Sequence, residues 1–433
     1  MSINTMLNLL LVLGFLILIL LRLHMAYSML FISFIYIVLS HKMPMSFLAQ
    51  TMVSGTTRYT MLAVPLFMAA GEIMNNAGIS QRLFDLADSL VGHIKGGLGH
   101  VNVLASLFFA GVSGSAAADC AGLGNIEIKA MTDKGYDIDF SVGITATSSI
   151  IGPIFPPSSP MILVGTLTGI SVGSLFMGGA VLGVIMTAIL MITVYFIAKK
   201  RNYPVSQKQS WKSRRYYFKR SFLALLLPIF MILTLVTGIV STTEVGALSV
   251  MYSIFLGVFV YKELKWKNVK PIFEKVVTTT GMIMLLIAGG NVLAGVMGAQ
   301  QLPNQIGIAL MNVTNDKNIL TLLMLLFILL MGTFLDTSAA ELLSIPLLFP
   351  IARMIGLNMV HFCITLIYGL MIGLLTPPMA ICLFITSKIG GISFERAFKS
   401  VRVYYIPLVI LLFIVAFVPE LTLWLPRLVF GTV

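Results

Sequence analysis

An all-α, polytopic membrane protein built from inverted repeats is the fold class that this sequence predicts. Of its 433 residues, 58% are hydrophobic and 10% are charged, whereas a soluble domain carries about 25% charged residues. A water-soluble fold could not bury this much apolar surface. One pattern of Gly, Ser and Pro also occurs twice, starting at Gly111 and at Gly332. Broken hydrophobic segments in matching halves are typical of secondary transporters.

The unbroken spans are apolar runs that reach or approach the roughly 20 residues needed to cross a bilayer. In chain order they cover residues 7–21, 181–198, 222–240, 245–261, 281–296 and 401–418. No basic residue precedes the first run, whereas Arg22 follows it. We therefore expect an uncleaved first helix rather than a signal peptide.

Two re-entrant hairpins are predicted between these spans. Residues 99–134 and 320–355 are apolar, but polar and Gly-containing stretches interrupt them at 111–115 and 332–336. Each segment is expected to dip into the membrane, turn at its interruption, and return to the same side. The two turns are called the hairpin tips below.

Two broken helices are predicted downstream of the hairpins. A glycine is followed at the same spacing by a Pro-Pro pair in each copy, at residues 152–157 and 373–378. Proline lacks an N–H donor and frees a carbonyl one turn earlier, so each pair predicts a break in its span.

Basic residues predict the orientation, because cytoplasmic loops are enriched in Lys and Arg. Clusters at 199–220 and 262–270 place both of these loops in the cytoplasm. Five crossings then separate the hairpins, so the hairpins should enter from opposite faces, with both chain termini outside. The net charge of +12 belongs to this loop pattern and does not indicate nucleic-acid binding. His41 and Lys42 fall on the outer side of the membrane in this scheme, which is a mild exception to the enrichment of basic residues in the cytoplasm.

The order of these elements divides the chain into scaffold and transport segments. Two short helices complete the scaffold: an interfacial helix at 46–57, and an amphipathic helix at 80–94 with Arg82 on its polar face. The second could be an arm along the membrane face or an ordinary loop helix. The expected division is 1–98 scaffold and arm, 99–170 first transport repeat, 171–318 scaffold and connecting helices, 319–390 second transport repeat and 391–433 C-terminal scaffold helix.

Candidate binding residues lie where the helices are interrupted. Non-helical backbone at membrane depth is stable only inside protein or beside a wet cavity, and helix N-termini attract anions. Hydroxyl and carbonyl oxygens suit Na⁺, whereas a Ca²⁺ site would need more carboxylates. The sequence therefore predicts sodium near the tips, with an organic anion between them. The candidates are Ser113, Ser115, Thr145, Ser148, Pro156, Pro157, Ser158, Thr333, Asp336, Thr337, Thr376, Pro377 and Pro378.

Acidic residues at membrane depth are rare and usually functional. Asp336 lies in the second tip, where it could balance sodium charge, cap the helix that starts at Thr337, or do both. Secondary candidates lie just beyond the tips or beside apolar runs: Asp119, Glu341, Glu72 and Glu244.

Several motifs resemble the large membrane subunit of tripartite ATP-independent periplasmic (TRAP) transporters. The similar stretches are 62–67, 109–119, 151–158, 372–378 and 423–426. They occur in the same order and at suitable spacing, and the resemblance extends from about residue 5 to residue 430.

This resemblance implies a sodium-driven symporter of a bacterial inner membrane that imports organic acids. The fold would be similar to the ion transporter superfamily, with a transport domain that moves like an elevator. Expected partners are a small membrane subunit of about four helices and a periplasmic binding protein. No catalytic residue and no cofactor other than the coupling Na⁺ is implied. By motif, Ser113, Ser115, Thr145, Gly332, Asp336 and Thr376 would lie at or near the sodium and substrate sites.

Two other functions fit parts of the pattern. Residues 111–114 match the Gly-x-Ser-Gly of an intramembrane serine protease, which would need a histidine base within hydrogen-bond reach of Ser113. A stand-alone symporter of the same superfamily, for dicarboxylates or other anions, would need no binding protein. The substrate itself is open among sialic acid, C4-dicarboxylates, sugar acids and keto acids.

Overall fold

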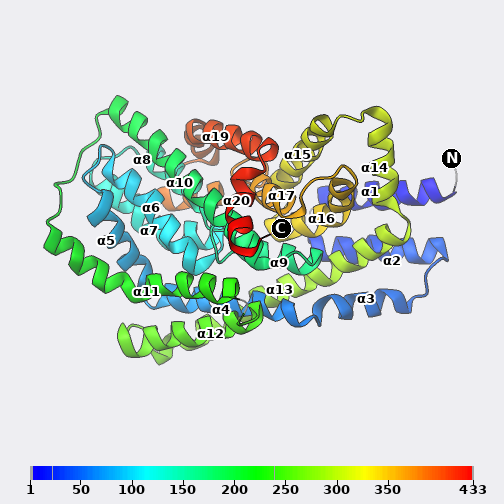
Figure 1. Cartoon of the computed structure of the whole chain (residues 1–433), viewed down its shortest axis with the longest axis horizontal. Coiled ribbons are helices and arrows are strands. Elements are labelled where there is room, and N and C mark those ends of the chain that lie inside the picture. The colour runs from blue at the N-terminus through cyan, green and yellow to red at the C-terminus, as the bar shows by residue number, and fades with distance from the viewer. Residues whose placement is uncertain (1–2, 22, 238, 432–433) are drawn as a thin grey trace.

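The computed structural model describes residues 3–21, 23–237 and 239–431, and every regular element in them is a helix (Figure 1). Within these ranges, six helices are long and apolar enough to cross a membrane, or up to seven if one bent pair is counted as a span. The predicted all-α membrane fold is therefore confirmed. The first six elements are α1 (Ile3–Leu20), α2 (Met25–Ser40), α3 (Ser46–Thr56), η1 (Tyr59–Leu62), α4 (Ala63–Asn76) and α5 (Ile79–Val91).

The first repeat contains the predicted hairpin and the predicted broken helix. The hairpin turns at Gly114 and Ser115, and the chain between residues 152 and 158 is not helical. The Pro156-Pro157 bond is cis, as is the Pro377-Pro378 bond. The elements are α6 (Gly97–Ser113), α7 (Ala116–Asp133), α8 (Ile138–Ser148), η2 (Ser149–Ile151) and α9 (Ser159–Thr168).

Five helices and a π-helical turn connect the two repeats in the described part of the chain. Three of them, α10, α11 and α13, extend beyond the apolar runs, because charged residues continue these helices past the segment that the bilayer needs. The short α14 was not predicted; with 12 residues it is about 18 Å long and too short to span a bilayer. The elements are α10 (Val172–Arg201), α11 (Trp211–Thr237), α12 (Thr242–Phe255), η3 (Leu256–Val260), α13 (Trp266–Ala299) and α14 (Leu302–Val313).

The second repeat has the same order of parts as the first. Its hairpin turns at Leu335 and Asp336, and the helix that follows is interrupted between residues 374 and 380. Another short, unpredicted helix, α20, ends the described chain. The elements are α15 (Lys317–Phe334), α16 (Thr337–Met354), α17 (Met359–Gly373), α18 (Ile381–Gly390), α19 (Phe394–Phe417) and α20 (Glu420–Phe430).

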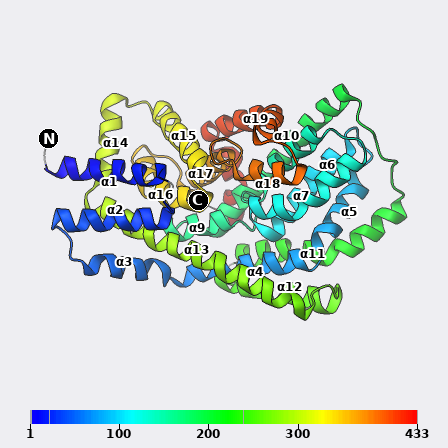
Figure 2. The same cartoon turned by 180° about the vertical axis from the view of Figure 1, so that it is seen from behind.

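The helices group into two sets. In both views, α3, α4, α12 and α13 run along one side of the molecule, and α19 lies on the opposite side (Figures 1 and 2). α13 packs against α2, α3 and α4, whereas α19 packs against α8, α17 and α18. α10 contacts α6, α17 and α20. The interrupted parts of the two repeats lie between these outer layers.

The predicted amphipathic helix is present as α5, but its polar face is not free. α4 and α5 form a bent pair with an angle of 71° at the break, and α5 packs against α6 and α11. Arg82 is 6% exposed, so this part of the polar face packs inside the protein. Its guanidinium donates to Glu263 Oε1 at 2.5 Å and lies 4.1 Å from the centre of the Tyr261 ring. These partners explain its burial, and the relation of α5 to the membrane face stays a prediction.

Candidate substrate and sodium site

A cavity of about 450 Å³ lies where the two hairpin tips meet. Residues 113–118 of the first tip and 336–338 of the second line it, together with residues beside both Pro-Pro breaks. Helices α4 and α13 form the rest of its wall. This volume falls within the roughly 300–1,000 Å³ of pockets that bind small organic molecules. The two distant repeats therefore share one site of ligand size.

The first tip is a tight turn with a capped helix behind it. Gly114 adopts a φ of +60°, and a Cβ on it would lie 3.3 Å from the backbone nitrogen of Ser159. Only glycine avoids both the strain and the crowding. The next residue, Ser115, accepts a hydrogen bond on Oγ from the Ala118 N–H at 3.4 Å. The backbone of the tip thus packs against the first Pro-Pro break, and the first residues of α7 line the cavity.

The second tip is held in a similar way. Asp336 Oδ1 accepts hydrogen bonds from the Ser338 and Ala339 N–H groups at 2.9 and 3.1 Å. The expected N-cap of α16 is therefore present, and Oδ2 lies outside these bonds. The Thr333 carbonyl accepts a hydrogen bond from the Met379 N–H at 3.1 Å, which joins this tip to the second Pro-Pro break.

Four of the predicted site residues line the cavity, and the others do not. The four are Ser113, Ser115, Asp336 and Thr337. Thr145 and Ser148 instead belong to a buried polar network: Asn102 Nδ2 donates to Thr145 Oγ1, and Ser148 Oγ donates to Asn102 Oδ1, both at 2.7 Å. Not among the lining residues are Thr145, Ser148, Pro156, Pro157, Ser158, Gly332, Thr333, Thr376, Pro377 and Pro378. Their roles in binding stay predictions.

The outlying hydroxyls have structural partners of their own. Ser158 caps α9 by accepting from the Met161 N–H at 3.1 Å, and its hydroxyl donates to the Pro153 carbonyl. Thr376 Oγ1 donates to the Ile372 carbonyl at 3.0 Å and contacts the Tyr405 hydroxyl at 3.2 Å. These bonds hold the edges of the two breaks in place around the cavity.

Comparison with known proteins identifies the architecture. The family model described as "Tripartite ATP-independent periplasmic transporter, DctM component" matches residues 12–421. The chain belongs to this family. It is 41% identical over 405 residues, 94% of this chain and 95% of the other, to the sialic acid TRAP transporter large permease protein SiaM of Vibrio cholerae.

Two further likenesses agree with this membership. The sialic acid TRAP transporter permease protein SiaT of Haemophilus influenzae is 37% identical over 379 residues, which are 88% of this chain and 62% of that longer protein. A solved structure of the YdaH transporter of Alcanivorax borkumensis has a TM-score of 0.61 and 14% identity, covering 86% of this chain and 87% of that one. The second likeness concerns the fold alone.

As a large permease of a TRAP transporter, this chain is a multi-pass protein of a bacterial inner membrane and is not an enzyme. Membership in the family implies a small membrane subunit and a periplasmic binding protein as partners. A protease site has no support, because no histidine is among the described residues that line the cavity with Ser113.

The acidic candidates of this permease separate into three kinds. Glu72 lines the cavity, whereas Glu244 forms a capping box with Ser241 at the start of α12 and does not. Asp119 and Glu341 are buried behind the tips, and neither carboxylate has a hydrogen-bond partner among the described residues. Glu127, which the sequence reasoning missed, is buried and accepts from Asn102 Nδ2 at 2.7 Å. Its signal was a second acidic residue in the same hairpin, eight positions after Asp119.

The donor set suits a monovalent cation. Within the described ranges, no group of three or more His, Cys, Asp and Glu side chains could hold a metal ion. The oxygens at the tips are the hydroxyls of Ser113, Ser115 and Thr337 and the single carboxylate of Asp336. Such a set holds too few carboxylates for a Ca²⁺ cage, and its binding of sodium stays a prediction.

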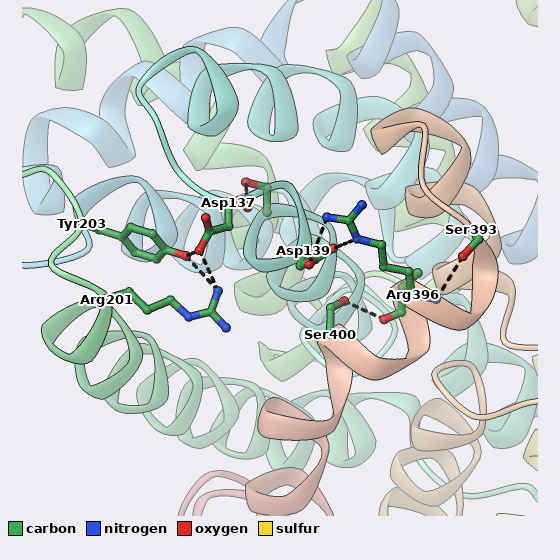
Figure 3. Close-up of polar contacts among 9 residues, drawn as sticks. Asp137, Asp139, Arg201, Tyr203, Ser393, Arg396 and Ser400 are labelled. Atoms are coloured by element: carbon green, nitrogen blue, oxygen red, sulfur yellow. Dashed lines mark hydrogen bonds and ion pairs between the residues drawn. The ribbon is translucent and has the colours of Figure 1, made fainter.

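A polar cluster fixes the far end of α8 (Figure 3). Asp137 accepts hydrogen bonds from the Tyr203 hydroxyl at 2.6 Å and from Arg201 at 2.8 Å. The hydrogen bond from Tyr203, followed by the Arg201 contacts, lowers the pKa of Asp137 below its ordinary value. Asp139, two residues after Asp137, accepts a hydrogen bond on Oδ1 from Arg396 Nε at 2.6 Å. The start of α8 is thus tied to the end of α10 and to the start of α19.

Proposed function

We propose that this permease imports an organic acid by sodium-coupled secondary active transport. The observation that carries the proposal is the shared cavity, which both hairpin tips line and which has the volume of a small-molecule site. Helix N-termini at the tips offer N–H groups and positive potential to a carboxylate. Hydroxyl and backbone oxygens nearby offer ligands to sodium.

Binding of the two species would then be coupled through the tips. Sodium brings positive charge to the tips, where the Asp336 carboxylate lines the cavity, and so raises the affinity for an anion between them. The anion in turn raises the affinity for sodium, because coupling between two ligands is reciprocal. We place Na⁺ near Ser113, Ser115, Gly332, Asp336 and Thr376. These positions follow the family motifs and stay part of the proposal.

Alternating access would occur by an elevator movement of the two repeats against the scaffold. The predicted division assigns 99–170 and 319–390 to the moving body. We add α10 and α19 to this body, because α10 packs against α6 and α17 and α19 packs against α8 and α18. The ion pairs Arg201–Asp137 and Arg396–Asp139 support the addition (Figure 3).

The substrate would be delivered by the periplasmic binding protein, and a membrane subunit of about four helices would brace the scaffold. Both termini of the large permease would lie on the periplasmic side. The likeness to the two sialic acid permeases makes N-acetylneuraminate the first substrate to test. C4-dicarboxylates and sugar acids are the alternatives.

Reconstitution tests this function directly. The permease and its small subunit are placed in liposomes, the binding protein is added outside, and uptake of labelled N-acetylneuraminate, succinate or gluconate is followed. An inward sodium gradient should drive accumulation of one acid, and a potassium gradient should not. Accumulation without a sodium gradient would refute the coupling. Equal uptake without the binding protein would favour a stand-alone symporter instead.

A further inference from the structure

We infer that Lys275 is an anion-selecting residue of the cavity, which exchanges the Glu72 carboxylate for the carboxylate of the transported acid. The inference deepens the proposed function and rests on it. Neither residue lies in the repeated motifs; Lys275 is in α13 and Glu72 is in α4.

The two residues form an ion pair on the part of the cavity wall that α4 and α13 provide. Lys275 Nζ lies 2.7 Å from Glu72 Oε2, and both residues line the cavity. Lys275 is the one basic side chain among the described lining residues. Lys275 lies in the first part of α13, six residues before the apolar run at 281–296 begins. Here its partner in the same wall balances the charge while no substrate is present.

The two partners are not held equally. The Lys275 side chain is 61% exposed, whereas the Glu72 side chain is 17% exposed. Glu72 also accepts a hydrogen bond on Oε1 from Asn76 Nδ2 at 3.1 Å. The carboxylate is therefore fixed to α4, and the ammonium on its flexible four-carbon chain is free to turn into the cavity. A lysine has three donors, so an incoming carboxylate can replace Oε2 while Glu72 keeps its bond to Asn76.

This arrangement selects against neutral molecules. An uncharged sugar would break the Lys275–Glu72 contact without supplying a compensating charge, whereas an organic anion exchanges one carboxylate for another. Discrimination of this kind comes from leaving a charged group unpaired when the wrong ligand is bound. The wall formed by α4 and α13 belongs to the scaffold in the proposed elevator. The contact is therefore available in the conformation described here and is lost when the tips move away.

Equilibrium binding to the complex of this permease with its small subunit tests the inference. The probes are labelled N-acetylneuraminate, succinate and gluconate at saturating sodium. Lys275→Met should raise the Kd of the acid that binds about tenfold to a hundredfold, as expected for losing a charge-assisted bond. Lys275→Arg keeps the charge and should stay within about threefold.

Glu72→Gln distinguishes anion selection from a merely structural role. It removes the competing carboxylate but keeps a group that can bond Asn76, so the Kd for the acid should fall about threefold or more. A structural ion pair would give the opposite result, with both substitutions weakening binding. The matched control is Lys270→Met on the same helix, because Lys270 is 84% exposed, pairs with Glu274 and does not line the cavity. It should leave the Kd unchanged.

Three outcomes overturn the inference, and they differ from one another. An unchanged Kd in Lys275→Met removes Lys275 from the site while the proposed function stands. A raised Kd in Glu72→Gln would mean that the Lys275–Glu72 pair is only a structural contact. If gel filtration shows that Lys275→Met fails to fold, the Kd of Glu72→Gln alone tests the inference. Absence of binding of all three acids to the unaltered complex refutes the proposed function, and this inference with it.

Discussion

Gly332 and Gly373 pack backbone against backbone at the second hairpin tip. A Cβ added at Gly332 would lie 2.9 Å from the Leu370 carbonyl oxygen and 3.2 Å from the Gly373 Cα, and one added at Gly373 would meet the backbone of Gly332. These are two of the glycines that the sequence repeats. Their lack of side chains lets α15 and α17 approach closely beside the cavity.

We expect Gly373→Ala to destabilise the permease, because the methyl group has only backbone to displace. Overpacking of this kind costs about 1–3 kcal/mol, so the melting temperature in detergent should fall by several degrees. The matched control is Gly281→Ala in α13, where a Cβ would meet nothing within 4 Å; alanine also favours the helix there. Equal melting temperatures for the two variants would contradict the close packing.

The first copy uses its matching glycines differently. A Cβ at Gly111 would lie 2.8 Å from the Pro228 side chain of α11, and one at Gly152 would lie 3.5 Å from the Ser115 backbone. The repeat in the sequence therefore predicted where close approaches occur, but it could not tell what approaches. That depends on which helices surround each copy, and the glycines themselves carry no such information.

Arg396 and Asp139 provide a test of which helices move together. If α8 and α19 belong to one body, a short bismaleimide bridge between Asp139→Cys and Arg396→Cys should leave sodium-driven uptake nearly intact. A bridge between Thr279→Cys in α13 and Ser338→Cys in α16 joins the two proposed bodies and should stop uptake. Each cysteine alone, treated with a monofunctional maleimide, is the control. Loss of uptake only when the first pair is bridged would remove α19 from the moving body.

Tyr203 and Asp137 give a pH dependence with a definite sign. The Tyr203 hydrogen bond lowers the folded-state pKa of Asp137 below its ordinary value of 3.8. The stabilising contribution is thus present above about pH 4 and is lost as the pH falls through the lowered pKa. It is small, because the Asp137 side chain is 57% exposed and exposed pairs are screened by solvent.

We therefore expect Tyr203→Phe to lower the melting temperature slightly at pH 7, with the difference from the unaltered protein shrinking below pH 4. Tyr195→Phe is a suitable control, since Tyr195 is an exposed tyrosine of α10, the helix that ends two residues before Tyr203. Thermal scans between pH 3 and pH 7 measure both variants. A difference that grows as the pH falls would refute the assigned direction.

Much of the fold and part of the site followed from the sequence alone. Polar interruptions in apolar runs predicted both hairpins, because non-helical backbone is stable at membrane depth only inside protein or beside a wet cavity. The tip residues Ser113, Ser115, Asp336 and Thr337 line the cavity, and their role in binding stays a prediction. Thr145 and Ser148 were identified by type but lie in a buried network, because hydroxyl chemistry alone does not say which way a helix faces.

Lys275 was missed for a different reason. It follows a basic cluster at 262–270, so its charge was attributed to the cytoplasmic loop rather than to the cavity. Helix α13 continues unbroken from Trp266 to Ala299, and the cavity opens onto its first half. Only the packing of α4 against α13 brings Glu72 and Lys275 together, and that contact joins residues far apart in the chain.

Asp336→Asn separates the two roles of Asp336. Asparagine is as good an N-cap as aspartate, so the bonds to the Ser338 and Ala339 N–H groups and the fold should survive. The negative charge is lost, however, and the half-saturating sodium concentration for uptake should rise about tenfold, equivalent to about 1.4 kcal/mol.

The control for this substitution is Asp316→Asn at the other end of the same hairpin. Asp316 caps α15 through bonds from the Asn318 and Ile319 N–H groups at 2.7 and 3.4 Å, and it does not line the cavity. Uptake measured across a sodium titration should therefore match that of the unaltered protein. If both variants gave the unaltered sodium curve, the Asp336 charge would have no part in sodium coupling. Its place in the tip would then be explained by the cap alone.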